Sequence, residues 1–365
     1  MTKTVFVGLS GGVDSAVSAA LLREAKPNNF EKLFGRPTPK GFRGYDVVGV
    51  FIKIWQPEFI ECTWAADRLD AMRVCVALGI PFREIDLSDD YKRMVVEDML
   101  AGYARGITPN PDVLCNRHIK FGSFLKHALD EGADYIATGH YARIQKSPPE
   151  ADPPSAEKIT ARSKRNQNDN VKCKNTYELL RGMDREKDQS YFLYTLGQRE
   201  LARTLSPVGG LKKQEVRSLA RKFNLPVAEK RDSQGLCFVG DVTMKDFLSR
   251  YIRLKEGNVL DASGIVIGSH DGAALYTIGQ RHGFTTEGAA GDRASSEEVL
   301  RPAGRMGDRI PHYVVSIDIS ANTVSVSPRR EDAARKVISL DSMHWIVSSL
   351  ALPLRAQTQA RYREK

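Results

Sequence analysis

The feature that most constrains the fold is a loop rich in glycine and serine, Gly8–Ser15, which reads GLSGGVDS. It follows an apolar run at Thr4–Val7 with the length of a buried strand, and it precedes a helical pattern at Ala16–Glu24. Between a strand and a helix, small residues let backbone amides approach oxygen anions, and the helix N-terminus favours negative charge. The sequence therefore predicts an α/β sheet with a phosphate site after its first strand.

The same alternation continues through the first 145 residues. Further apolar runs of strand length occur at Val47–Ile54, Phe82–Ile85 and Tyr135–Thr138. Helical periodicity separates them at Ala65–Leu78, Tyr91–Ala104 and Ile119–Asp130. This order predicts a parallel sheet in a nucleotide-binding domain over residues 1–186. A polar stretch at 146–176 is expected to be an insertion in a surface hairpin with strands at Tyr141–Gln145 and Tyr177–Arg181.

Two further domains are expected. Helical patterns such as Lys213–Lys222 and Val242–Arg250 predict a small helical or mixed central domain over residues 187–256. From residue 257 to 365 short β-like runs alternate with Gly, Asn, Asp and Pro, which predicts a β-barrel-like domain with another insertion at Thr285–Asp308. Because the chain ends on what looks like a strand in progress, we expect this barrel to be truncated, short of its closing strands.

Composition narrows the class of protein. Lys plus Arg number 54 against 45 Asp plus Glu, and the net charge of +9 favours a polyanionic partner such as nucleic acid. No apolar run reaches the roughly 18 to 20 residues that span a bilayer, and no signal region precedes the first strand, so we expect a cytoplasmic protein that does not enter a membrane. The five cysteines lack the spacing of a zinc finger or a disulfide framework: Cys62, Cys75, Cys115, Cys173 and Cys237.

The chemistry of the first loop can be narrowed further. It lacks the lysine of a Walker A motif and the spacing of a dinucleotide fingerprint. It resembles instead the SGGxDS loop of ATP pyrophosphatases, which adenylate a substrate; a plain glycine-rich turn is the alternative. The resemblance implies that ATP, accompanied by Mg²⁺ near Asp14, is bound by Gly8, Leu9, Ser10, Gly11, Gly12, Val13, Asp14 and Ser15. We expect no metal held by a cluster of protein side chains.

Two cysteines lie in chemically suggestive surroundings. In Asn110–Asn116, NPDVLCN, Cys115 sits just ahead of a predicted helix start, where the helix dipole favours the thiolate, and Asp112 is close enough to act as a general base. In Asp232–Phe238, DSQGLCF, Cys237 comes two residues after the flexible Gly235 and near Asp232 and Ser233. Such a pair suits a catalytic disulfide or a persulfide relay, whereas the alternative for Cys115 is a small buried apolar residue. Cys75, by contrast, is expected in the core of a helix.

Six segments occur together and in order along the chain: the Gly8–Ser15 loop, TPNPDVLCN, ATGHYAR, KDQSYFLYTL, DSQGLCFVG and LYTIGQRHG. Together they resemble the tRNA-specific 2-thiouridylases over essentially the whole chain. The resemblance implies an ATP-dependent tRNA-uridine 2-sulfurtransferase that converts the wobble uridine to 2-thiouridine. Its expected partners are tRNAs for lysine, glutamate and glutamine, and a sulfur relay from a cysteine desulfurase.

The same resemblance implies roles for individual residues. Cys115 corresponds to the nucleophile, Cys237 to the persulfide carrier that pairs with it in a disulfide, and Asp112 to the general base. Ile52 and Gly139 are expected near the nucleotide. The residues expected to meet the target base or the tRNA are Asn110, Pro111, Asp112, His140, Lys187, Asp188, Gln189, Arg361 and Tyr362. Direct attack by the persulfide and prior release of hydrosulfide by Cys115 remain open as alternative routes.

Two other classes of protein remain as alternatives. An amidating ligase or a lysidine-type tRNA ligase shares the phosphate loop but has no need for Cys115 and Cys237. A non-enzymatic RNA-binding protein needs the basic surface but neither the loop nor the cysteines. Both alternatives leave residues of the sequence unexplained.

Overall fold

The computed structural model describes residues 2–34, 38, 40–60, 64–147, 176–232, 242–286, 311–334, 337–340, 343–347, 352–360 and 362. The chain divides into two compact units. The first contains Met1–Tyr91, Asp112–Phe238 and Met343–Lys365, and the second contains Lys92–Pro111 and Val239–Ser342. No helix among the described residues combines the length and apolar character needed to cross a membrane.

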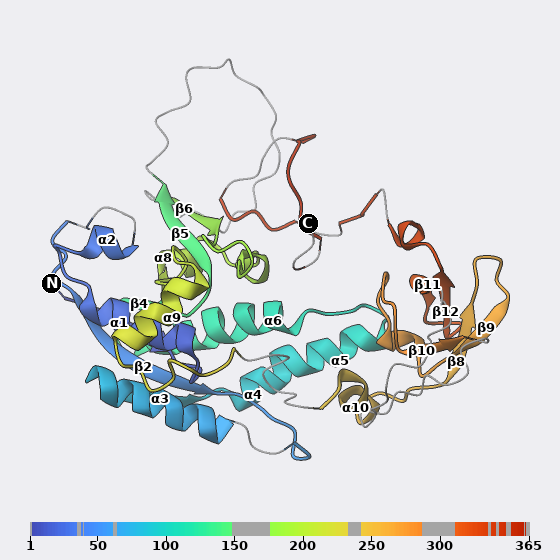
Figure 1. Ribbon diagram of the computed structural model, residues 1–365, viewed down its shortest axis with the longest axis horizontal. Coiled ribbons are helices and arrows are strands. Elements are labelled where there is room, and N and C mark those ends of the chain that lie inside the picture. The colour runs from blue at the N-terminus through green and yellow to red at the C-terminus, as the bar shows by residue number, and fades with distance from the viewer. Residues whose placement is uncertain are drawn as a thin grey trace, which may run out of the picture. The chain divides into compact units, whose positions relative to one another are not determined.

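The first unit is built on a parallel sheet with the strand order β3-β2-β1-β4-β7 (Figure 1). Its strands are β1 (Lys3–Gly8), β2 (Tyr45–Lys53), β3 (Phe82–Asp86), β4 (Tyr135–Ala137) and β7 (Thr204–Leu205). Val5 on the central strand β1 pairs with Val47 on one side and Tyr135 on the other. Both faces of β1 are covered, so Val5 and Val7 are fully buried. The predicted parallel α/β sheet is confirmed.

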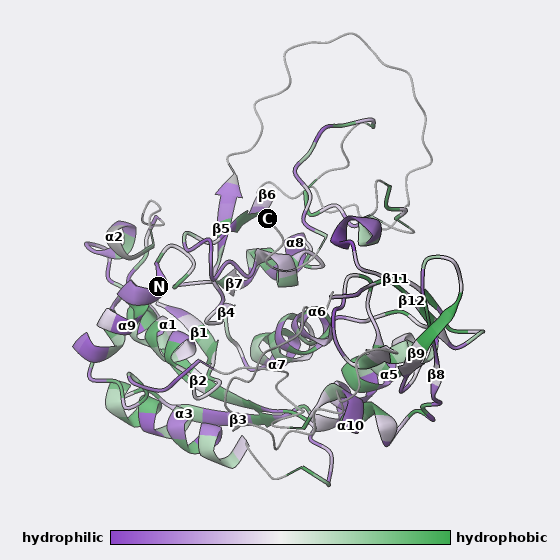
Figure 2. Ribbon diagram, turned by 45° about the vertical axis from the view of Figure 1, so that its right-hand side comes forward, coloured by the Kyte–Doolittle hydropathy of each residue, from purple (hydrophilic) through white to green (hydrophobic). Residues whose placement is uncertain are grey.

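The helices around this sheet are α1 (Val13–Glu24), α2 (Phe30–Phe34), α3 (Trp64–Leu78), α4 (Ser88–Tyr91), α6 (Pro111–Leu114), η2 (Cys115–Ser123), α7 (Phe124–Asp130), η3 (Ser190–Leu193), α8 (Gln198–Ala202) and α9 (Lys213–Lys222). Helix α1 is buried almost all round because α9 lies beside it and β2 packs below (Figure 1). It is accordingly green along most of its length in Figure 2, whereas α3 alternates between green and purple. Cys75 on α3 lies in the same core, as predicted.

An antiparallel hairpin leaves the sheet after β4. Its strands, β5 (Ala142–Ser147) and β6 (Thr176–Arg181), pair from Ala142 with Arg181 to Ser147 with Thr176. The predicted hairpin is therefore confirmed. The chain between its strands, residues 148–175, lies outside the described residues.

The second unit has its own sheet, with the strand order β10-β9-β8-β12-β11. Its elements are η1 (Lys92–Val96), α5 (Glu97–Ala104), α10 (Met244–Ser249), β8 (Gly257–Leu260), β9 (Val266–His270), η4 (Ala273–Leu275), β10 (Phe284–Thr286), β11 (Tyr313–Asp318), β12 (Thr323–Ser327) and η5 (Arg330–Ala333). The strands β8 and β12 are parallel and the other pairs antiparallel. A separate core around Val259, Tyr276 and Val324 supports this sheet. The predicted small β fold is confirmed, whereas the boundaries at residues 186 and 256 remain predictions.

Candidate active site

The phosphate loop connects the central strand β1 to helix α1. Gly12 is the N-cap residue of α1, and no side chain makes a capping hydrogen bond there. Gly11 has φ +70, and a Cβ atom on it would lie 2.5 Å from the backbone oxygen of Asp67. A larger residue would thus be strained both by its backbone conformation and by its neighbour. The loop presents small residues and a helix N-terminus without a side-chain cap, which fits an anionic group such as the polyphosphate of ATP.

The residues after β4 lie directly against this loop. The strand order reverses between β1 and β4, which is where open α/β sheets bind ligands. A Cβ atom on Gly139 would lie 2.7 Å from the backbone nitrogen of Ser15 and 2.9 Å from the carbonyl carbon of Asp14. At Gly8 a Cβ atom would lie 3.6 Å from Ile52 Cδ1. The structure therefore brings Gly8, Ile52 and Gly139 to one edge of the sheet. That this edge binds the nucleotide stays a prediction.

Asp14, the acidic residue of the loop, is engaged by two side chains. Lys213 Nζ, at the start of α9, lies 2.8 Å from Asp14 Oδ1 and 2.9 Å from Asp14 Oδ2. The hydroxyl of Tyr141 donates to Asp14 Oδ1 over 2.7 Å. Burial and the negative charge of Asp14 raise the pKa of Tyr141, so its hydroxyl keeps its proton. Sequence reasoning missed both partners, because 199 positions separate Lys213 from Asp14.

Lys213 also joins a second carboxylate. Its Nζ lies 2.7 Å from Asp232 Oδ1, and Asp232 is bound in addition by Lys187 over 2.8 Å and by Arg217 over 2.8 Å. Partial burial works to raise the pKa of Asp232, but hydrogen bonds from Lys187 and Lys213 outweigh it and lower the pKa to about 2. Lys187, predicted to contact tRNA, therefore lies in this ion-pair network of Asp14, Asp232, Lys187, Lys213 and Arg217.

The residues that follow Lys187 are fixed to the chain after β4. Gln189 Oε1 accepts a hydrogen bond from the backbone nitrogen of Tyr141 over 3.0 Å, and the backbone nitrogen of Gln189 donates to the carbonyl of Tyr141 over 2.9 Å. Asp188 Oδ1 accepts from the backbone nitrogen of Gly182 over 2.9 Å. Two segments predicted to contact tRNA, at residues 140 and 187–189, are thus held together by hydrogen bonds.

Asp112 and His140 both lie near the ammonium group of Lys120. Burial raises the pKa of Asp112 and Lys120 partly opposes this effect, so the carboxylate is a stronger base than an exposed aspartate. Burial, assisted by Lys120, lowers the pKa of His140 well below its ordinary value, so this imidazole is neutral near pH 7. His140 Nδ1 lies 2.8 Å from Thr138 Oγ1, and its ring lies 5.7 Å from that of Phe121.

The helix that carries Cys115 begins earlier than the sequence predicted. The helical segment starts at Pro111 and widens into the π-helical stretch η2 from Cys115 onward, rather than starting at Ile119. Proline suits the first position of a helix, because its missing N–H group would have had no partner there. Cys115 is therefore buried in the second turn instead of lying ahead of the helix. Cys237, its proposed partner, lies outside the described residues.

Within the first unit, aromatic rings connect the predicted C-terminal tRNA contact to η3. The ring of Tyr362 lies 4.5 Å from that of Phe192 and 6.1 Å from that of Tyr191. The carbonyl of Phe192 also accepts a hydrogen bond from Asn116 Nδ2 over 3.2 Å. Tyr362 is thus connected through Phe192 to the helix that carries Cys115. Arg361 lies outside the described residues.

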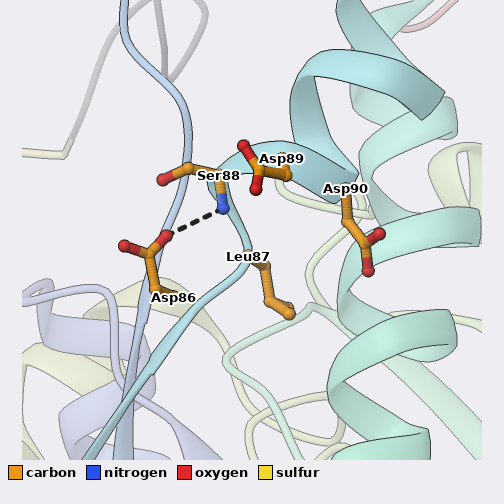
Figure 3. A pocket seen from close by; sticks show the side chains of 5 residues that line it. All are labelled: Asp86, Leu87, Ser88, Asp89 and Asp90. Atoms are coloured by element: carbon orange, nitrogen blue, oxygen red, sulfur yellow. Dashed lines mark hydrogen bonds between the residues drawn. The ribbon is translucent and has the colours of Figure 1, made fainter.

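A hollow of about 420 Å³ follows β3 and is lined by Asp86, Leu87, Ser88, Asp89 and Asp90 (Figure 3). The Asp86 carboxylate accepts a hydrogen bond from the backbone nitrogen of Ser88, drawn dashed in Figure 3, and it pairs with Lys53 over 2.7 Å. None of the predicted site residues lines this hollow. In the part of the chain that the structure describes, no three His, Cys, Asp or Glu side chains gather as a metal site.

Comparison with known proteins identifies the class to which this arrangement belongs. Residues 3–34 and 41–241 match the family described as tRNA methyl transferase HUP domain, and residues 245–328 match that described as tRNA methyl transferase PRC-barrel domain. A solved U34-tRNA thiolase, NcsA from Methanococcus maripaludis, shares 17% sequence identity and covers 68% of this chain and 63% of its own, with a TM-score of 0.35. That likeness is too low to support an argument. The two family matches show that the chain is a HUP-domain protein with a PRC-barrel domain.

Curated relatives narrow the class to a family. A tRNA-specific 2-thiouridylase MnmA from Akkermansia muciniphila is 40% identical over 370 residues, which cover 99% of this chain and 85% of the relative. A tRNA-specific 2-thiouridylase MnmA from Proteus mirabilis is 38% identical over 368 residues, which cover 99% of this chain and 84% of the relative. The chain belongs to the tRNA-specific 2-thiouridylase family.

Proposed function

We propose that this chain is an ATP-dependent tRNA-uridine 2-sulfurtransferase that converts the wobble uridine of tRNA to 2-thiouridine. The observation that carries the proposal is the convergence of three elements in the first unit. The uncapped N-terminus of α1 offers a phosphate site, and Gly139 and His140 follow the adjacent strand β4. The helix from Pro111, which carries Asp112 and Cys115, continues into η2, whose Phe121 ring lies 5.7 Å from the ring of His140. Full-length similarity to relatives named tRNA-specific 2-thiouridylase supports the same assignment.

The reaction needs activation because the oxygen on C2 of uridine is a poor leaving group. Transfer of AMP from ATP to that oxygen releases pyrophosphate and makes the oxygen part of a phosphate ester. The loop Gly8–Ser15 holds the polyphosphate through its amides and the N-terminus of α1, and Ile52 and Gly139 lie at the same edge of the sheet. Mg²⁺ would neutralise part of the phosphate charge. The Asp14 carboxylate near this site is already paired with Lys213.

Sulfur transfer follows activation. The terminal sulfur of a Cys237 persulfide attacks C2, its proton passes to Asp112, and AMP leaves. Cys115 thiolate then attacks the Cys237 sulfur, which releases 2-thiouridine and leaves a disulfide between the two cysteines. A cellular thiol reductant must reopen that disulfide, which suits a reducing cytoplasm. In the alternative route, Cys115 attacks the persulfide first and releases hydrosulfide, which then attacks C2.

The experiment is single-turnover transfer of labelled sulfur from a persulfide-loaded chain to unmodified tRNA with ATP and Mg²⁺. Wild-type protein is expected to yield labelled 2-thiouridine at the wobble position, together with AMP and pyrophosphate. Cys115→Ala and Cys237→Ala are expected to abolish label transfer. Cys75→Ala is the matched control, because Cys75 lies in the core on α3 and takes no part in the proposed reaction.

Two outcomes would contradict the proposal. Full label transfer by either of the two cysteine variants would exclude the sulfur relay. Incorporation of a methyl group from S-adenosylmethionine, in place of sulfur, would favour the activity that the description of the matching family names. Methyl transfer from S-adenosylmethionine consumes no ATP and would leave the loop Gly8–Ser15 without a role, so we expect sulfur.

A further inference from the structure

The phosphate loop contains a carboxylate at the place where it is expected to bind a polyanion. Asp14 is the second residue of α1, and the N-terminus of α1 is the proposed site for the phosphates of ATP. A carboxylate that close to phosphate repels it unless a cation neutralises the carboxylate. The loop itself supplies no cation, because none of the residues Gly8–Ser15 is Lys or Arg.

Lys213 supplies the missing positive charge from a distant part of the chain. Its ammonium group bridges both oxygens of Asp14 over 2.8 and 2.9 Å and one oxygen of Asp232 over 2.7 Å. The Lys213 side chain is only 14% exposed, so water screens these contacts less than at an open surface. Its Nζ also lies 5.9 Å from the centre of the Tyr141 ring, whose hydroxyl donates to the same carboxylate.

The second carboxylate keeps Lys213 in this position. Asp232 is held by Lys187 and Arg217, each over 2.8 Å, and Arg217 also donates to the backbone carbonyl of Ala228 over 3.0 Å. Asp232 is therefore a fixed anchor rather than a free side chain. With one carboxylate on either side, the ammonium group of Lys213 is restrained toward Asp14.

We propose that Lys213 is a positioning residue for ATP binding, which acts by neutralising and orienting Asp14 at the N-terminus of α1. This inference rests on the proposed function only in that ATP is the nucleotide. Without Lys213, the Asp14 carboxylate keeps only the neutral hydroxyl of Tyr141 as a partner among these contacts. An uncompensated carboxylate charge beside the phosphates, in surroundings of intermediate dielectric, is expected to weaken ATP binding about tenfold.

The test measures the affinity of the full chain for ATP with Mg²⁺ by titration calorimetry in the absence of tRNA. Lys213→Met keeps the length of the side chain and removes its charge, and it is expected to weaken binding about tenfold. Lys213→Arg keeps the charge and is expected to retain most of the affinity. Lys222→Met is the matched control, since Lys222 is exposed at the other end of the same helix. The double variant Asp14→Asn/Lys213→Met removes both charges and is expected to recover most of the lost affinity.

Two results would overturn the inference. The first is an ATP affinity of Lys213→Met equal to that of wild type. The second is a double variant that binds ATP as weakly as Lys213→Met, which would mean that Lys213 acts on the nucleotide without Asp14. If Lys213→Met does not fold, the double variant decides: an ATP affinity close to that of wild type supports the inference, and a tenfold loss overturns it. A loss of stability alone lowers the amount of protein that binds, but it leaves the dissociation constant for ATP of the folded fraction unchanged. Wild-type protein that binds ATP but makes no 2-thiouridine would refute the proposed function and leave this inference standing.

Discussion

Gly139→Ala is the sharpest test of how the end of β4 supports the phosphate loop. The added Cβ atom would lie 2.7 Å from the backbone nitrogen of Ser15 and 2.9 Å from the carbonyl carbon of Asp14. An ordinary contact starts at 3.4 Å, so the loop and the chain after β4 must separate by about 0.7 Å. Both neighbouring atoms belong to the backbone, and therefore no side-chain rotation relieves the clash.

Overpacking of this kind costs about 1 to 3 kcal/mol, and if the whole cost falls on the nucleotide-bound state, kcat/KM for ATP falls about 5- to 150-fold. The assay is pyrophosphate release at varied ATP with saturating tRNA, combined with urea unfolding to correct for the folded fraction. Gly210→Ala is the matched control, because a Cβ atom at Gly210 meets nothing within 4 Å. A wild-type kcat/KM for folded Gly139→Ala would refute the close approach on which this reasoning depends.

Two further predictions concern titrating groups. Burial raises the pKa of Asp112, and a general base acts in its deprotonated form, so the rate of thiolation should rise with pH through that raised pKa. Because Lys120 lowers the pKa of Asp112, Lys120→Met should move this rise to still higher pH. Asp112→Asn should abolish the rise. An unchanged pH profile in Asp112→Asn would exclude Asp112 as the base. Burial also raises the pKa of Cys75 to about 11, so iodoacetamide at pH 8 should leave Cys75 unmodified in the folded protein and alkylate it in urea, as peptide mass spectrometry can show. Rapid alkylation in the folded state would contradict its burial on α3.

Short sequence patterns predicted those elements that depend mainly on interactions within their own segment. The strand at Thr4–Val7 and the loop Gly8–Ser15 were predicted because a short apolar run and a cluster of small residues act within their own segment. The strand β7 was missed because Thr204–Leu205 is too short to produce a pattern. Pairing with β4, which is distant in sequence, is what makes those two residues a strand.

The site shows the same division between local and long-range effects. The approach of Ile52 and Gly139 to the loop followed from the resemblance and from the expected sheet. The ion pair between Asp14 and Lys213 joins residues 199 positions apart, and Lys213 had no distinguishing mark beyond its place at a helix start. The start of the helix at Pro111 was missed because Asn110 and Pro111 resemble an ordinary turn as much as a helix start.

The hairpin of β5 and β6 has a practical consequence for engineering. Pairing of Ser147 with Thr176 returns the chain to the same place whatever lies between these two residues. The entropic cost of closing a loop grows only slowly, by about 0.6 kcal/mol for each doubling of its length. An affinity tag or a fluorescent reporter inserted between Ser147 and Thr176 should therefore leave the parallel sheet and its phosphate loop undisturbed. The hairpin offers a position for attaching a label that reports on tRNA binding without altering either cysteine of the proposed relay.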